Sequence, residues 1–168
     1  MEEKERTAII TEDLCQYALD REDIMWIKGT VPDSADPDKL EYELQLLKII
    51  TIGWSLSYFL QEDPLKKDIV EHFWHNMHEI SQGLSRTTSL FIGKDINYFN
   101  ILRSRLDSYV LAMSRTGDHN PAQAIGPEFA ELCSSPQDLF TSMAGSRMFM
   151  SALGGVRQYL QAAGLTPS

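Results

Sequence analysis

Apolar residues recur at three- and four-residue steps along most of this chain, the spacing that places side chains on one face of an α-helix. In residues 95–116 the stripe consists of Phe99, Leu102, Leu106, Tyr109 and Met113. No segment shows the sustained alternation of β-branched residues that is typical of a strand. The pattern therefore predicts an all-α protein without a sheet.

Helix boundaries are marked by capping residues, by prolines and by glycines. Starts are expected at Thr11, Asp36-Pro37, Asp63-Pro64, Asp95 and Ser135-Pro136, and ends at Gly29, Gly93 and Gly117. These signals predict about six helices, near residues 11–28, 37–62, 64–91, 95–116, 127–133 and 136–163. Asp118-His119-Asn120-Pro121 is a loop by composition.

Short connections between helices favour a single-domain antiparallel helical bundle that spans residues 1–168, with flexible ends at 1–8 and 165–168. The helix expected at 37–62 changes character along its length. Leu40, Leu44 and Leu47 form one stripe, whereas from Ile49 onward apolar residues point in all directions. Such a helix is buried on every side, so we expect it to run through the middle of the bundle.

The last expected helix contains two features that leave alternatives open. Gly154-Gly155 disfavours a helix interior and is expected to kink or divide it. Met143, Met148 and Met150 surround Phe149. They form either an adaptable surface for a partner or ordinary gap-filling core, and the second alternative is the commoner one.

The charge of −9 is unevenly distributed along the chain. Residues 1–45 hold thirteen acids and five bases, whereas residues 86–116 hold five bases and two acids. Overall acidity argues against nucleic acid as a partner, because neutralised phosphates supply the affinity of such complexes. Opposite charge on two segments instead favours self-docking, as in a homodimer, or a charged protein partner.

The longest apolar run, Ile49 to Leu60, is about twelve residues, which is shorter than the roughly 20 residues that cross a membrane. The acidic residues 1–6 are not followed by the apolar stretch of a signal peptide. Cys15 and Cys133 belong to no metal-binding or redox spacing and are typical of buried thiols in a reducing compartment, although a disulfide between them is an alternative. We therefore expect a cytoplasmic protein that does not bind membranes.

Residues 69–84 hold three of the four histidines and the one candidate metal site of the sequence. Glu71, His75 and His78 share a helical stripe, and two imidazoles with one carboxylate are a ligand set used by iron and zinc. Apolar side chains occupy the opposite side of the same helix. The histidine stripe is therefore expected to face outward, either as a solvated surface or as a polar interface, and a metal site is the third alternative.

Catalytic templates are absent, since the chain has no Gly-rich phosphate loop and no GxSxG elbow. The sequence therefore favours a non-enzymatic protein that acts through protein–protein or regulatory binding, with no cofactor. One competing hypothesis is a metal-dependent enzyme or metal sensor that uses Glu71, His75 and His78. Another is a small-ligand sensor with an aromatic pocket lined by Trp54, Tyr58 and Trp74.

Overall fold

The computed structural model describes residues 2–92, 96–116 and 120–165. Its helices are α1 (Glu2–Leu19), α2 (Glu22–Lys28), α3 (Pro37–Phe59), α4 (Lys66–Ile92), α5 (Tyr98–Ser114), α6 (Pro121–Leu132) and α7 (Leu139–Ala162). The described part of the chain contains no strand. The predicted all-α bundle is therefore confirmed.

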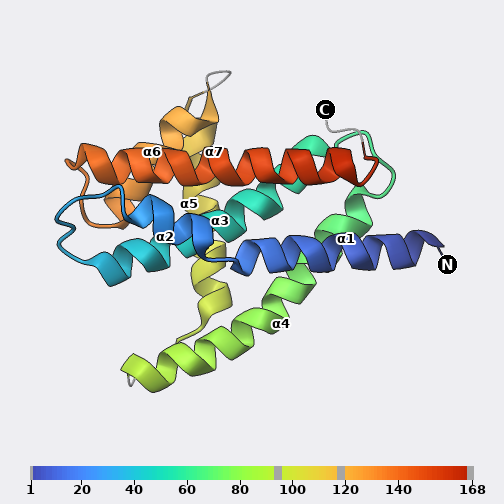
Figure 1. Cartoon of the computed structure of the whole chain (residues 1–168), viewed down its shortest axis with the longest axis horizontal. Coiled ribbons are helices and arrows are strands. Elements are labelled where there is room, and N and C mark those ends of the chain that lie inside the picture. The colour runs from blue at the N-terminus through green and yellow to red at the C-terminus, as the bar shows by residue number, and fades with distance from the viewer. Residues whose placement is uncertain (1, 93–95, 117–119, 166–168) are drawn as a thin grey trace.

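Helices α1 and α7 lie side by side and run in opposite directions, so that the start of α1 meets the end of α7 (Figure 1). Two side-chain hydrogen bonds join them. Arg6 Nη2 donates to the carbonyl of Ala163 at 2.7 Å, and the Tyr159 hydroxyl donates to Asp13 Oδ2 at 2.6 Å. Helix α5 runs across the direction of this pair (Figure 1), so the bundle is not a simple set of aligned helices.

Helix α3 occupies the centre of the bundle, as its sequence predicts. It packs against α1, α2, α4, α5 and α7. Side chains on all of its sides are fully buried, among them Leu44, Leu46, Leu47, Ile49 and Ile52. Burial of one such side chain contributes about 1.5–3 kcal/mol, so α3 contributes a large share of the hydrophobic stabilisation.

The helix starts show how far capping signals define a boundary. The prediction for α3 is confirmed, because Asp36 caps it by accepting from the backbone N–H of Lys39 at 3.0 Å. Helix α7 begins three residues later than the serine–proline signal predicts, because Asp138 and not Ser135 is its capping residue. Asp95, Gly93 and Gly117 lie outside the described residues.

The predicted helix 11–28 is wrong at its start and is interrupted. Helix α1 already begins at Glu2, and Thr11 lies inside it with its hydroxyl bonded to the Thr7 carbonyl at 2.7 Å. The chain then turns after Leu19, before α2 begins. Thr11 is therefore a buried helix-interior residue and not a capping residue, because its hydroxyl is satisfied by the preceding turn.

Two further boundaries differ from expectation. Helix α6 begins at Pro121, six residues before the predicted start at 127, because the side chain of Asn120 caps it by accepting from the backbone N–H of Ala122. Helix α7 is continuous through Gly154 and Gly155. The hydroxyl of Tyr17 lies where a side chain of residue 155 would begin, 2.3 Å from an ideal Cβ, so packing against α1 explains a glycine there.

Gly53 lets the side chain of Trp74, in α4, approach the backbone of α3. A Cβ at this position would lie 2.2 Å from Cζ2 of Trp74. A Cβ at Gly83, in α4, would have no atom within 4 Å. The two glycines therefore differ in packing although both lie in helices.

This difference predicts opposite effects of alanine. We expect Gly53→Ala to destabilise the fold by about 1–3 kcal/mol, because the added methyl overpacks the contact with Trp74. Gly83→Ala should stabilise the fold by about 0.5–1 kcal/mol, because alanine favours an open helix position. Urea unfolding followed by circular dichroism measures both, and equal effects of the two substitutions would contradict the packing described.

Candidate functional site

The histidine stripe of α4 faces outward, as the opposing apolar face predicts. Phe73 and Met77 are fully buried on one side of this helix, whereas Glu71, His75 and His78 are exposed on the other. The stripe is therefore a surface of the molecule and not part of its core.

The stripe residues have different neighbours. His75 Nε2 lies 3.3 Å from Glu79, and the ring of His78 packs edge-on against Phe99 with 4.7 Å between ring centroids. Within the part of the chain that the structure describes, no group of three or more His, Cys, Asp or Glu side chains is placed to hold a metal ion. Glu71, His75 and His78 thus share a helix face without converging on one point.

The aromatic residues of the pocket hypothesis do not form one cluster. The Trp54 ring stacks on Tyr58, with 5.2 Å between centroids, and is tilted against Phe149 of α7 at 5.8 Å. Trp74 instead packs against Phe73 and the backbone of Gly53. These aromatic side chains therefore serve contacts between helices on two sides of α3.

Lys48 is a buried charged residue that sequence reasoning missed. Its side chain is fully buried in α3, and Nζ donates to the Asp20 carbonyl at 2.7 Å and to Asp23 Oδ1 at 2.9 Å. The same ammonium lies 4.4 Å from the ring centroid of Tyr17, a cation–π distance. A buried lysine is a candidate nucleophile in principle, but this one is fully engaged in joining α1 and α2 to α3.

Glu43 is the second buried charge on α3. Its side chain is 1% exposed and accepts a bidentate pair of hydrogen bonds from Arg105 of α5, with Nε–Oε2 at 3.0 Å and Nη2–Oε1 at 2.7 Å. The bond to Glu43 is the main cause that raises the pKa of Arg105. Since both carboxylate oxygens are occupied, Glu43 is a structural anchor and not a free general base.

The sequence does contain a signal for the burial of Glu43 and Lys48. Glu43 and Lys48 lie in the run that leads into the all-apolar part of α3, where a polar side chain must find a partner inside the protein. The partners themselves, Asp23 and Arg105, lie far away in the sequence. Only the fold identifies them.

The cysteines are free thiols, and both are buried, so the alternative of a disulfide between them is wrong. Burial raises the pKa of Cys15 to about 11 and that of Cys133 to about 12. A nucleophilic cysteine requires the opposite shift, because the thiolate is the reactive form. Neither thiol is therefore suited to catalysis.

We predict that both thiols of the folded protein react far more slowly with a disulfide reagent at pH 8 than the same thiols in denaturant. The raised pKa values of the two thiols also make the free energy of unfolding depend on pH. The stability that the protonated thiols contribute is present below about pH 9 and is lost as the pH rises towards 11–12, because the unfolded chain ionises first. Absorbance of the released reagent measures reactivity, and a thiol that reacts at the same rate in both states would contradict this assignment.

The first half of α7 carries an exposed apolar stripe. Its members are Leu139, Phe140, Met143 and Met150, with exposed fractions of 70%, 51%, 39% and 49%. Met148 and Phe149, by contrast, are buried. Each of the two alternatives for the methionines thus applies to different residues. Met148 fills the core, whereas Met143 and Met150 face solvent and are available to a partner.

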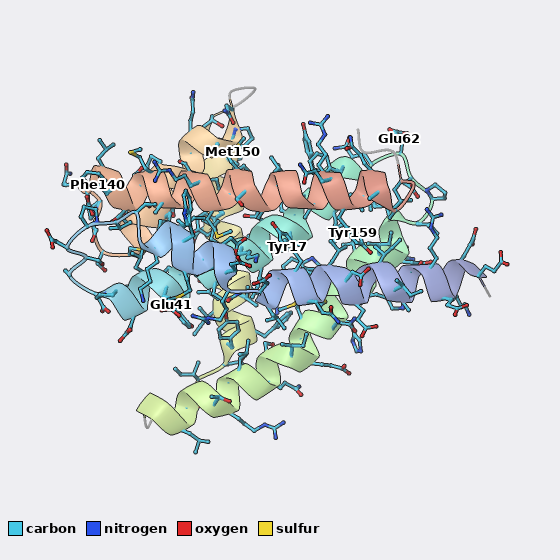
Figure 2. All side chains as sticks on the ribbon, viewed as in Figure 1. Tyr17, Glu41, Glu62, Phe140, Met150 and Tyr159 are labelled. Carbon is cyan, nitrogen blue, oxygen red and sulfur yellow. The ribbon has the colours of Figure 1, made fainter. Side chains whose placement is uncertain are left out.

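The α7 stripe, defined as Leu139, Phe140, Met143 and Met150, is bordered by positive charge. Arg147 lies between the two methionines on the same helix face, and α7 contains a second arginine, Arg157, but no acidic residue. Phe140 lies near the start of α7 and Met150 near its middle (Figure 2). Aromatic residues, methionine and arginine are the residue types enriched in the centres of protein interfaces.

A groove lies at the other end of α7, where this helix meets the beginning of α1. It has a volume of about 470 Å³ and is lined by Glu2, Glu5, Arg6, Ile9, Ile10, Tyr159, Ala162 and Ala163. Tyr159 lies between the two helices (Figure 2). Burial and the bond to Asp13 raise the pKa of Tyr159, so its hydroxyl remains the donor of that bond.

The groove combines an apolar floor with acidic residues. Ile9 is 54% exposed within it, whereas Ile10 beneath is buried. Glu2 and Glu5 are exposed, and neither has an ion-pair partner among the described residues. Arg6, the one cation among the described lining residues, is bonded to the Ala163 carbonyl, so the α1–α7 groove has a net negative charge that is complementary to the arginine-containing stripe.

No helix of the described residues is both long and apolar enough to cross a membrane. The chain matches no known protein family, no curated protein and no solved structure.

Proposed function

We propose that this protein acts by binding another protein chain in the cytoplasm, with a second copy of itself as the partner, and that it catalyses no reaction. The α7 stripe is the observation that carries this proposal. Four large apolar side chains on one helix remain 39–70% exposed, although full burial of an exposed side chain of this size contributes about 1.5–3 kcal/mol. An exposed patch of this kind is typical of an interaction surface.

The state of the polar side chains supports a binding role over catalysis. Lys48, Glu43 and both cysteines, the buried groups with the most reactive chemistry, are either bonded to structural partners or held in their unreactive protonated form. Catalysis needs such groups to be accessible to a substrate. The exposed methionines, in contrast, have flexible side chains that adapt to an opposing surface.

Self-association can be tested with two methionines that are equally exposed. Met150, in the α7 stripe, and Met25, in α2, are each 49% exposed. We expect the wild-type protein to form a dimer in a concentration series measured by light scattering. Met150→Glu should raise the dissociation constant of this dimer at least tenfold, about 1.4 kcal/mol, because it buries a charge in the interface.

Met25→Glu is the matched control, because it adds the same negative charge at the same exposure outside the stripe. It should leave the dissociation constant within about twofold of the wild-type value. Circular dichroism verifies that both variants are folded. A wild-type protein that stays monomeric at all concentrations and ionic strengths would refute the proposal, as would equal weakening by both variants.

A further inference from the structure

We infer that the α7 stripe of one copy docks in the α1–α7 groove of a second copy, so that two α7 helices cross antiparallel about a two-fold axis beside Gly154. This inference rests on the proposed self-association and specifies its geometry. It assigns the groove a protein occupant and makes the acidic start of α1 part of the interface.

The part of the stripe from Met143 to Met150 matches the groove in length. Met143, Arg147 and Met150 follow one another at four and three residues, and they span about 10 Å along one helix face. Glu2 and Ile9 define the groove along α1 over the same seven-residue interval, again about 10 Å. A single helix face of this size therefore fits along the groove.

The stripe and the groove also match in chemistry. Met150 would contact the apolar floor at Ile9, and Arg147 would lie opposite Glu5. Arg147 has no ion-pair partner among the residues that the structure describes. Docking thus pairs charges that are unpaired in one copy and buries apolar side chains that are exposed in it.

Helix α7 carries the stripe and also forms one wall of the groove. Two copies can therefore make the same contact twice. The Arg6 bond to the Ala163 carbonyl places this arginine, and with it the preceding residue Glu5, near the level of residue 163. If Arg147 of one copy lies at this level of the other, the midpoint of the pairing is residue 155. A two-fold axis there satisfies both grooves at once and gives a closed dimer.

The surface at the midpoint permits close approach. Gly154 is exposed, and no atom lies within 4 Å of the position that its Cβ would occupy. Exposed Ser151 precedes it on the same face. Two antiparallel helices can therefore approach each other at Gly154 itself, with the exposed side chains of Arg157 and Gln158 flanking the contact.

The crossing can be tested with two glycines that are equally open. Gly154→Cys places an accessible thiol beside the inferred axis, and Gly83→Cys places one on α4. We expect a short bismaleimide to convert most of the Gly154→Cys protein into covalent dimer and less than about a tenth of the Gly83→Cys protein. The native thiols are buried and do not compete.

Charge reversal tests the docking itself. Arg147→Glu should weaken the dimer at least tenfold in light scattering, and adding Glu5→Arg in the same chain should restore most of the affinity, because the pair is re-formed in the opposite sense. A dimer that is weakened by Met150→Glu, yet shows neither cross-linking through residue 154 nor rescue by Glu5→Arg, would overturn the inferred geometry and leave the proposed function intact. A wild-type protein that is monomeric would overturn both.

Discussion

The arrangement of this protein depends on the burial of α3, a helix that has a neighbour on almost every side. Its leucines and isoleucines supply the hydrophobic contacts, but two buried charges determine which helices pack where. Lys48 bonds to the Asp20 carbonyl at the turn between α1 and α2, and Glu43 receives both hydrogen bonds of Arg105 from α5. A buried charge is costly without its partner, so these two contacts fix the positions of α1, α2 and α5 on α3.

These internal contacts determine what remains on the surface. Tyr17, held over Lys48, reaches the backbone of α7 near Gly155 and sets the position of α1 along that helix. The placement leaves a groove between the first turns of α1 and the last turns of α7, and it leaves the outer face of α7 uncovered. The α1–α7 groove and the exposed α7 stripe are therefore consequences of how α1 packs in the bundle.

Local sequence signals predict the helices well and their junctions less well. The apolar stripe of α4 correctly places its histidines outside, and the all-round apolar character of α3 correctly places that helix in the centre. The break between α1 and α2 has a local signal, because Asp20 Oδ1 accepts from the backbone N–H of Glu22, but the bond from Lys48 to the Asp20 carbonyl comes from a helix that is distant in the sequence and could not be predicted. The same limit applies to the candidate surfaces, since periodicity alone did not separate buried Met148 from exposed Met143 and Met150.

Methionine-methyl NMR can show whether the outer face of α7 is covered when two copies associate. Met77 and Met148 are fully buried, whereas Met25 and Met150 are equally exposed. Across a dilution series, we expect the methyl resonances of Met143 and Met150 to shift together while those of Met25, Met77 and Met148 remain constant. Resonances of Met143 and Met150 that are independent of concentration, or a shift confined to Met25, would contradict it.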